Sequence, residues 1–213
     1  MYSVKEAFYT LQGEGARAGR ASVFCRFACC NLWSGREQDR ATSACRFCDT
    51  DFVGTDGQNG GRFHDAEGLA DHLAALWPAV PGGRRYVVFT GGEPLLQLDS
   101  PLIEALHARD FEIAVETNGT LTPPAGIDWL CVSPKGDTSL AITAGDELKL
   151  VYPQQHAPPE RFAGFSFRHF YLQPMDLGPL GGDGNTMADV VDYCLNAPQW
   201  QLSLQTHKIA GID

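Results

Sequence analysis

Three cysteines in the first quarter of the chain are the residues best suited to chemistry. Fourteen residues (31–44) lie between Cys30 and Cys45, whereas only two lie between Cys45 and Cys48. The chain has seven cysteines, an odd number, and its first residues lack the apolar core of an export signal. Disulfides are therefore not expected, and clustered thiols point to a metal site or to catalysis. The remaining cysteines within apolar patterns are interpreted as small buried hydrophobic residues: Cys25, Cys131 and Cys194.

Two kinds of metal site agree with these three thiols. One is a structural zinc site with a distant histidine as fourth ligand, although such sites commonly use two close pairs of ligands and only Cys45 and Cys48 form a pair. The other is an iron–sulfur cluster held by three thiolates, with one iron left open to bind a cofactor. The cysteines alone do not separate these alternatives.

A glycine pair after a later strand favours the second alternative. The stretch RYVVFTGGEPLLQ is an apolar strand that runs into Thr90, Gly91, Gly92 and Glu93. Two glycines let the backbone approach a ligand closely, and the carboxylate of Glu93 can accept a hydrogen bond from an ammonium group. Together with three cysteines at the end of an earlier strand, this pair predicts a cofactor site.

The elements that position these residues alternate between strands and helices. Apolar, β-branched or aromatic runs predict strands at 21–28, 85–90, 111–117, 129–133 and 147–152, with two more at 168–173 and 200–206. Helices are predicted where Asp65 caps 65–77, where Ser100 caps a helix with Pro101 at its first position, and where Asn185 opens 185–196. Residues 31–44 and 54–65 lack periodicity and are predicted to be loops. Because strands outnumber helices, the pattern predicts an α/β fold that is an abbreviated, irregular partial TIM barrel.

Composition narrows the class of protein. The formal net charge is −10, and no basic face typical of a nucleic-acid binder is visible, so no direct nucleic-acid partner is expected. No apolar run of eighteen residues predicts a membrane span, and a cytoplasmic protein is expected. No linker divides the chain, which predicts one domain over 1–213 with a cluster-binding insertion at about 30–64.

At this point the sequence resembles a known family. Three cysteines followed by a GGEP strand end look like the radical S-adenosylmethionine (SAM) superfamily, although the usual first arm there is three residues long. The sequence is similar to the 7-carboxy-7-deazaguanine synthase family, in which the first two cluster cysteines are also far apart. The similarity rests on this long spacing and on the motifs LQGEG, RFACCNLW, FCDTDF, TGGEP, SPK, QPMD and QTHK. The resemblance runs from residue 8 to the C-terminus. It implies a 4Fe–4S cluster, SAM and Mg²⁺ as cofactors.

The resemblance implies roles for the cluster and SAM residues. In that family the first cluster cysteine precedes Asn-Leu, which makes the ligands Cys30, Cys45 and Cys48. Cys29 stands where the family commonly has glycine and is interpreted as having no ligand role. No side chain is assigned as catalytic, because the adenosyl radical carries the chemistry. The residues expected at SAM are Phe47, Cys48, Asp49, Gly92, Glu93, Ser133, Pro134, Lys135, Gln173, Pro174, Met175 and Asp176.

The resemblance also implies a substrate side and a magnesium ligand. Thr50 would ligate Mg²⁺ together with the substrate, since a single hydroxyl needs further oxygens to complete the shell. A pterin edge presents paired donors and acceptors, and a substrate carboxylate suits the forked donors of Arg26. The residues expected at the substrate are Leu11, Gln12, Gly13, Glu14, Arg26, Thr90, Glu116, His207 and the C-terminal Asp213, with Asn118 as a further candidate.

The implied activity is that of a carbon–nitrogen lyase in queuosine-type 7-deazapurine biosynthesis. It is a radical ring contraction of 6-carboxy-5,6,7,8-tetrahydropterin to 7-carboxy-7-deazaguanine with loss of ammonia. An outside reductant such as a flavodoxin and a homodimer are the partners that the resemblance suggests. Two alternatives are a different radical enzyme, such as one that generates glycyl radicals in proteins, and a zinc-stabilised binding module without catalysis. QGEG and the long cysteine arm argue against the first alternative.

Overall fold

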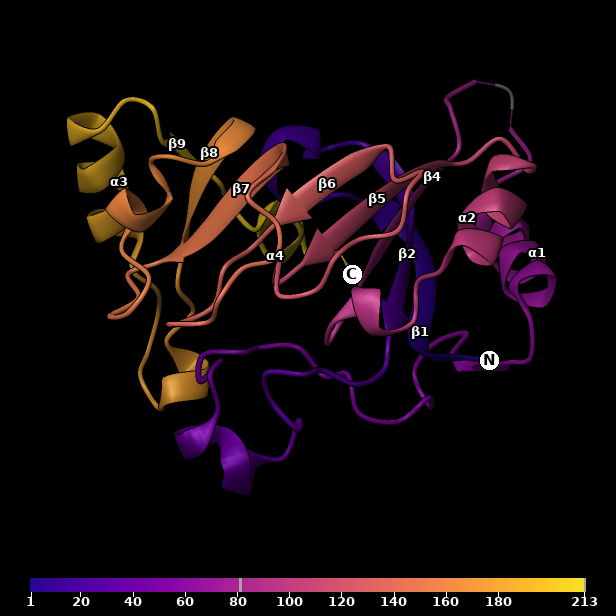
Figure 1. Ribbon diagram of the computed structural model, residues 1–213, viewed down its shortest axis with the longest axis horizontal. Helices are drawn as coiled ribbons and strands as arrows, with labels where there is room; N and C mark the ends of the chain where they lie inside the picture. The colour runs from indigo at the N-terminus through magenta and orange to yellow at the C-terminus, as the bar shows by residue number, and fades with distance from the viewer. Residues whose placement is uncertain (81, 213) are drawn as a thin grey trace.

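The computed structural model describes residues 1–80 and 82–212, and in that part of the chain nine strands form one curved sheet. The strand order is β3-β1-β2-β4-β5-β6-β7-β8-β9 (Figure 1). The bounds are β1 Tyr2–Leu11, β2 Ala21–Phe27, β3 Gly61–Phe63, β4 Tyr86–Gly91, β5 Glu112–Thr117, β6 Trp129–Val132, β7 Ala144–Tyr152, β8 Ser166–Pro174 and β9 Gln201–Leu202.

The sheet is parallel except at one side. Each neighbouring pair from β2 to β9 is parallel, whereas β1 runs antiparallel to both β2 and β3. The edge strands β3 and β9 do not pair with each other, so the sheet stays open. The α-helices of the described residues are α1 Ala66–Leu76, α2 Ser100–His107, α3 Met187–Asn196 and α4 Thr206–Ala210. The predicted partial barrel with fewer helices than strands is confirmed.

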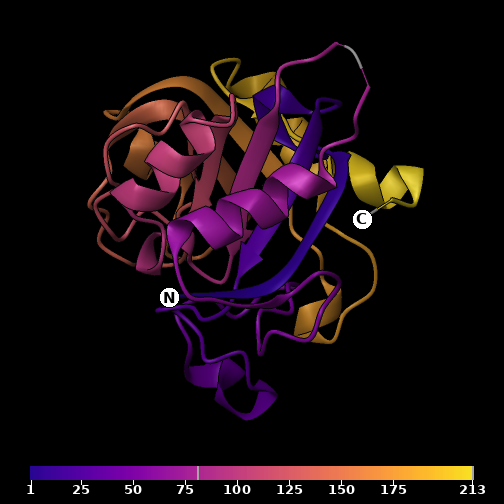
Figure 2. The ribbon, with the colours of Figure 1, turned by 90° about the vertical axis from the view of Figure 1, so that its right-hand side faces the viewer.

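The two faces of the sheet follow from the alternation of side chains along its strands. Val87 and Phe89 of β4 pack on α1 and α2, in a core that includes Leu73 and Leu106. Figure 2 shows α1 lying across the outer face of the sheet. Tyr86 and the residues in step with it point to the other side, into the interior of the barrel. Burial on both faces explains why these strands read as continuous apolar runs.

Helix starts agree only in part with the predictions. The carboxylate of Asp65 accepts a hydrogen bond from Gly68 N at 2.8 Å and caps α1 as predicted. The prediction that Ser100 caps α2 is wrong, because Asp99 is the cap and accepts from Leu102 N at 3.2 Å. Asn185 accepts from the amide of Met187 at 3.1 Å, two residues before the helical turns begin.

The five strands predicted first and the sixth, at 168–173, are confirmed. Of 200–206 only residues 201–202 are a strand, and α4 begins at 206. The predicted loop at 54–65 holds β3, and residues 31–44 hold the 3₁₀ turn Glu37–Thr42. The long strand β1 was not predicted, because an irregularity between Val4 and Glu6 interrupts its two-residue period.

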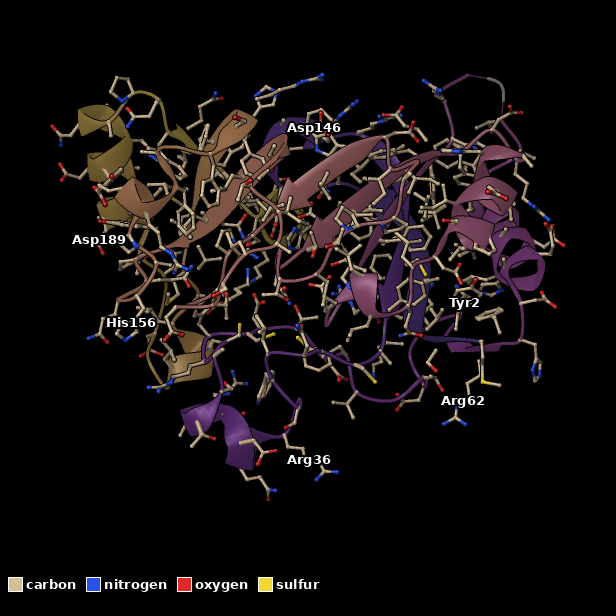
Figure 3. The ribbon with its side chains drawn as sticks, in the orientation of Figure 1. Tyr2, Arg36, Arg62, Asp146, His156 and Asp189 are labelled. Carbon is tan, nitrogen blue, oxygen red and sulfur yellow. The ribbon has the colours of Figure 1, made fainter. Side chains whose placement is uncertain are left out.

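The connection between β2 and β3 passes over the carboxyl ends of the parallel strands. In Figure 3, Arg36 of this connection extends away from the body, while Asp146 near the start of β7 lies at the opposite edge of the sheet. The cysteines after β2 therefore lie at the edge where open parallel sheets form their sites. Within the described ranges, no helix is long and apolar enough to span a bilayer.

Candidate active site

A cavity of about 500 Å³ lies at this edge of the sheet and gathers most of the predicted site residues. Its wall includes Leu11, Gln12, Gly13, Glu14, Arg26, Cys30, Cys45, Phe47, Cys48, Asp49, Thr50, Thr90, Gly92, Glu116, Asn118, Ser133, Lys135, Gln173, Pro174, Asp176 and His207. Glu93, Pro134 and Met175 do not line it, and Asp213 is outside the described residues. Segments from both ends of the chain thus meet in one site.

The three thiols reach this cavity from two loops. Cys30 follows β2, and its sulfur accepts a hydrogen bond from Leu32 N at 3.4 Å, but burial raises its pKa. Cys45 and Cys48 are hydrogen-bonded to each other. That bond lowers the pKa of Cys48 to about 6 and raises the pKa of Cys45. Of these two thiols, Cys48 is therefore the one that ionises more readily.

Cys29 differs from its neighbour Cys30 in every respect that matters for ligation. It is exposed, does not line the cavity, and has a φ of 75°, a backbone conformation that favours glycine. Its carbonyl oxygen accepts a hydrogen bond from Glu93 N at 2.9 Å. A Cβ at Gly92 would overlap this same carbonyl group, so the glycine at 92 allows the two backbones to pack together.

Glu93 has its hydrogen-bond partners within the fold. Its side chain is fully buried, and its carboxylate accepts hydrogen bonds from Leu95 N at 3.0 Å, Thr117 Oγ1 at 2.7 Å and Asn118 N at 2.8 Å. Burial raises the pKa of this carboxyl group. Both oxygens are engaged within the fold and Glu93 does not line the cavity, so a further bond from a cofactor ammonium to Glu93 stays a prediction. Glu93 fixes the end of β5, where Asn118 Nδ2 donates to Asn31 beside Cys30 at 2.9 Å.

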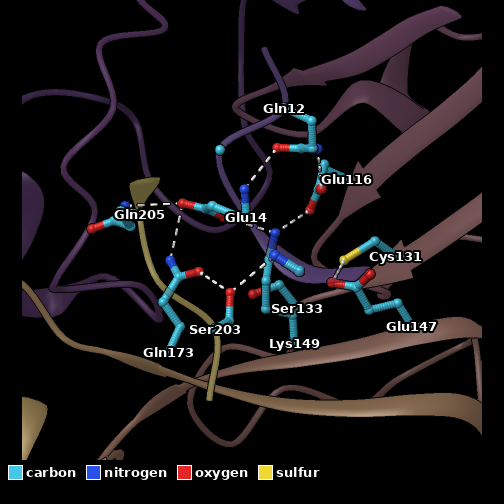
Figure 4. Close-up of polar contacts among 12 residues, drawn as sticks. Gln12, Glu14, Glu116, Cys131, Ser133, Glu147, Lys149, Gln173, Ser203 and Gln205 are labelled. Carbon is cyan, nitrogen blue, oxygen red and sulfur yellow. Dashed lines mark hydrogen bonds and ion pairs between the residues drawn. The ribbon is translucent and has the colours of Figure 1, made fainter. Parts of the chain in front are cut away.

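A buried network of charges also lines the cavity, and Figure 4 shows its polar contacts. The ammonium of Lys149 lies 2.7 Å from Glu14 Oε2 and 2.9 Å from Glu116 Oε2. Glu14 also accepts from the amides of Gln173, at 3.1 Å, and Gln205, at 3.0 Å. β5, β7 and β8 therefore each contribute a polar side chain to the same face of the barrel interior.

The charge states in this network follow from burial and contact. Burial by itself would raise the pKa of Glu14, but the charge and hydrogen bond of Lys149 outweigh it and lower that pKa to about 2. Burial by itself would lower the pKa of Lys149, yet the surrounding carboxylates raise it well above its usual value. Lys149 and Glu14 are both ionised at neutral pH.

The C-terminal helix α4 closes one side of the cavity. Thr206 donates to the carbonyl of Gly13 through its backbone N and through Oγ1, each at 2.8 Å. Lys208 Nζ bonds Asp49 at 2.9 Å and Asp176 at 2.8 Å, so it joins the loop after the last cysteine to the end of β8. Burial lowers the pKa of His207, whose ring faces the cavity between these contacts.

The residue predicted to bind the substrate carboxylate, Arg26, and the predicted magnesium ligand, Thr50, also line the cavity. Arg26 Nε donates to Glu6 Oε1 at 2.7 Å, so part of its guanidinium group already has a partner. Thr50 is half-buried, with Oγ1 at 3.5 Å from Asp49 Oδ1. Among residues 1–80 and 82–212, no three His, Cys, Asp or Glu side chains are close enough to hold one metal ion. Thr50 and the described residues alone therefore do not complete a magnesium shell.

Comparisons with known proteins agree with this geometry. A profile described as "Radical SAM superfamily" matches residues 38–148. The chain is 66% identical to a 7-carboxy-7-deazaguanine synthase of Bordetella pertussis and 64% identical to one of Caulobacter vibrioides, over 99% of each chain. The chain belongs to the 7-carboxy-7-deazaguanine synthase family. The crystal structure of QueE from Escherichia coli has the same fold, with a TM-score of 0.70, 24% identity and coverage of 95% of this chain and 93% of that one.

Membership of the radical SAM superfamily implies a 4Fe–4S cluster and SAM, and the thiols fit such a cluster. In such a cluster each thiolate binds a different iron atom. Cys30, Cys45 and Cys48 line one cavity, and in the described part of the chain no group of three or more His, Cys, Asp or Glu side chains is placed to hold a single ion. A closed zinc site needs four ligands, whereas three thiols suit a cluster that leaves one iron open.

Some residues that line the cavity were not predicted from the sequence. Among them are the polar residues Lys149, Gln205, Lys208, Lys5, Glu6 and Asp51. For Lys149 a signal existed, because ELKLVY places Glu147 and Lys149 two residues apart on one face of an apolar strand. A charged pair on a buried strand face indicates a site rather than a packing surface. The others carry no such pattern, because Lys5 and Glu6 lie at the irregularity of β1, Gln205 and Lys208 belong to the short α4 and its cap, and Asp51 lies in a loop.

Proposed function

We propose that the chain catalyses the reaction after which its family is named, the ring contraction of 6-carboxy-5,6,7,8-tetrahydropterin to 7-carboxy-7-deazaguanine with release of ammonia. The observation that carries the proposal is the single cavity that three cysteine thiols share with a buried Glu14–Lys149–Glu116 network. Thiols at one end suit a cluster, and carboxylates at the other suit the N–H groups of a pterin. The 66% identity to a named synthase supports the same reaction.

Cys30, Cys45 and Cys48 would hold the cluster, and the bound cluster with SAM supplies a 5′-deoxyadenosyl radical. The residues proposed for SAM lie at the ends of alternate strands of the sheet: Gly92 after β4, Ser133 and Lys135 after β6, and Gln173 to Asp176 at the end of β8. Lys135 is held by Ser133 and stands 6.0 Å from the ring centre of Phe47. Pro134 and Met175 would act through their backbone, since their side chains do not line the cavity.

The protein's part in the reaction is to orient the pterin and to keep water away. Glu14 and Glu116 present acceptors, and Gln12 and Arg26 present donors, on the same side of the cavity. Leu11, Gly13, Thr90, Asn118 and His207 complete the walls around the substrate. Asp213 is retained as a candidate contact outside the described residues. A fixed set of hydrogen bonds would hold the carbon–hydrogen bond of carbon 6 in line with the radical.

Magnesium would bind between Thr50 and the substrate. Thr50 supplies only one oxygen, so substrate oxygens and water would have to complete the shell of the ion. The remaining elements of the proposal are one domain over 1–213 with a cluster-binding insertion at about 30–64, a homodimer, a cytoplasmic location, and electron supply by a reductant such as a flavodoxin. No direct contact with nucleic acid or membrane is part of the proposal.

Anaerobic turnover tests the proposal. The cluster-loaded protein is incubated with the tetrahydropterin, SAM, Mg²⁺ and dithionite or a flavodoxin system, and the products are identified by mass spectrometry. We expect 7-carboxy-7-deazaguanine and ammonia in equal amounts, with no product from Cys48→Ala. A brown preparation that cleaves SAM but leaves the pterin intact would indicate a different radical enzyme. A colourless preparation that retains zinc would reject radical chemistry altogether.

A further inference from the structure

Lys149 is a buried cation for which the family motifs provide no role. Its side chain is 4% exposed and comes from the middle of β7. Its ammonium joins Glu14, after β1, to Glu116, in β5, at 2.7 and 2.9 Å. These three residues are far apart in the sequence, so their meeting is a product of the fold. Burying such a group is costly unless it serves the groups that it contacts.

Each oxygen of the two carboxylates has a donor from the protein. Lys149 occupies one oxygen of each, while Gln173 and Gln205 donate to Glu14 Oε1 and Gln12 donates to Glu116 Oε1 at 3.2 Å. Ser203 Oγ donates to Gln173 Oε1 at 3.2 Å, which orients that amide (Figure 4). Glu14 Oε1 already accepts two bonds, but Glu14 Oε2 and both oxygens of Glu116 each retain a lone pair, so both groups can still accept a bond from a ligand in the cavity.

The other titratable groups around this network do not replace Lys149. Burial raises the pKa of Glu147 and the pKa of Cys131, two neighbours of Lys149, and so favours the uncharged form of each. Burial lowers the pKa of His207 next to Glu14, and beyond it Lys208 is paired with Asp49 and Asp176. Within the described chain, Lys149 is therefore the one cation at ion-pair distance from Glu14 and Glu116.

We propose that Lys149 is a positioning residue of the substrate site: its ammonium pairs with the Glu14 and Glu116 carboxylates and holds them in fixed orientation, so that both accept hydrogen bonds from the N–H groups of the pterin. Lys149 itself touches neither the reacting carbon nor SAM. This inference rests on the proposed function and adds to it the group that organises the two carboxylates.

Binding measured without turnover tests this role. Calorimetry of tetrahydropterin binding is carried out between pH 6 and 8 on the anaerobic, cluster-loaded protein with SAM but without reductant. In Lys149→Met the cation that opposes burial is lost, so the pKa of Glu14 rises and the carboxyl takes up a proton as the pH falls. We expect the ratio of Kd in the variant to Kd in the wild type to increase by up to about tenfold for each pH unit lowered. This ratio cancels titration of the substrate itself.

Two further variants serve as controls. Glu147→Gln changes the same face of β7 but touches neither Glu14 nor Glu116, and we expect its Kd ratio to stay constant with pH. Lys149→Arg keeps a cation and should also keep a constant ratio, even if its larger group weakens binding. A constant ratio in Lys149→Met, or the same pH dependence in Glu147→Gln, would overturn the inference while leaving the proposed function intact. Failure of the wild type to bind the pterin would instead reject both.

Thermal unfolding tests the same role if the Lys149→Met variant is too unstable for the binding measurement. If Lys149→Met loads no cluster, thermal unfolding is compared with that of the double variant Glu14→Gln/Lys149→Met. Removing the carboxylate together with its cation should restore a large part of the lost melting temperature, since an unpaired buried charge is what destabilises the single variant. An equal loss in both variants would show that Lys149 acts through packing, which would overturn the inference.

Discussion

At the scale of single residues, the assignment of the cluster ligands depends on the register of the doublet Cys29-Cys30. Cys30 points into the cavity, whereas Cys29 is exposed and has a φ of 75°. A cluster ligand needs its side chain in the cavity, as Cys30 has. The left-handed backbone at Cys29 instead favours glycine, which has no side chain. This difference makes the register open to a direct test.

Cys30→Ala, Cys45→Ala and Cys48→Ala should each abolish cluster assembly, because a three-thiolate site cannot lose a ligand. Cys29→Gly should keep the cluster and raise the free energy of unfolding by about 1 kcal/mol, through relief of the left-handed backbone. Iron content and visible absorbance after anaerobic reconstitution measure the first effect, and urea unfolding measures the second. Loss of iron from the Cys29 variant but not from the Cys30 variant would move the register by one residue.

Thr50 is the residue that links the proposed magnesium to the protein. Thr50→Val keeps the shape of the side chain but removes its oxygen, so cluster content and SAM binding should survive. Turnover should fall by as much as roughly a hundredfold, through misplacement of the substrate, and should lose most of its dependence on added Mg²⁺. Initial rates across a magnesium titration measure this effect. The control is Thr42→Val, since Thr42 lies outside the cavity and donates only to the carbonyl of Asp39. An unchanged magnesium response in Thr50→Val would remove the residue from the site.

At the scale of elements, the short helix α4 depends on its contact with the loop after β1. α4 has only five residues, too few for stability on its own, and it is anchored by the two bonds from Thr206 to Gly13. His207 packs so closely over Gly13 that a Cβ there would overlap its ring and approach its Cβ. Any side chain at residue 13 must therefore displace the side chain of His207.

Gly13→Ala should lower kcat/KM for the pterin by about tenfold to a hundredfold, because a shift of about 1 Å misplaces the substrate. Iron content and SAM affinity should stay unchanged, since the cysteine loops and the end of β4 are not in contact with this residue. Steady-state kinetics measure the first effect. Gly164→Ala is the control, because a Cβ there meets no atom within 4 Å. A kcat/KM within twofold of the wild type would show that α4 does not shape the substrate site.

These elements also show how far the sequence could predict the structure. β4 and β5 were predictable because burial on both faces leaves continuous apolar runs. β1 was not, since the irregularity between Val4 and Glu6 breaks its alternation, and α4 was not, since its stability comes from tertiary contacts. A short motif can indicate that Glu93 is near the site, but it cannot show which way its side chain points. The charged pair in ELKLVY marked Lys149, but its contacts could not be predicted, because Glu14 after β1 and Glu116 in β5 are far from it in the sequence.

At the scale of the whole molecule, a second charged cluster stabilises the end of the barrel opposite the cavity. Glu112 at the start of β5 accepts two bonds from Arg20, at 2.9 and 2.7 Å, and also pairs with Arg17 at 3.2 Å. Arg20 lies 3.7 Å over the ring of Tyr86. These contacts tie the segment between β1 and β2 to the middle of the sheet. The barrel interior thus has one charged network that faces substrate and one that is structural.

The structural network should depend on pH in a defined direction. The hydrogen bonds from Arg20 lower the pKa of Glu112, so its contribution to stability is present above the unfolded-state value of about 4.3 and is lost as the pH falls through the folded-state value. Arg20→Met should therefore reduce the free energy of unfolding by about 2 kcal/mol at pH 7, the size of a charged hydrogen bond, and by clearly less at pH 3. Urea unfolding of cluster-free protein at both pH values measures the difference without acid loss of the cluster.

The exposed pair of Arg168 and Asp146 provides the control for this prediction. Arg168 is 75% exposed and 3.3 Å from its partner, so Arg168→Met should change stability by less than about 0.5 kcal/mol at either pH. Arg20 could also stabilise the fold by packing on Tyr86, a contact that does not titrate with Glu112. An equal loss at pH 7 and pH 3 in Arg20→Met would therefore assign the effect to the aromatic contact, whereas a loss confined to the higher pH assigns it to the Glu112 carboxylate.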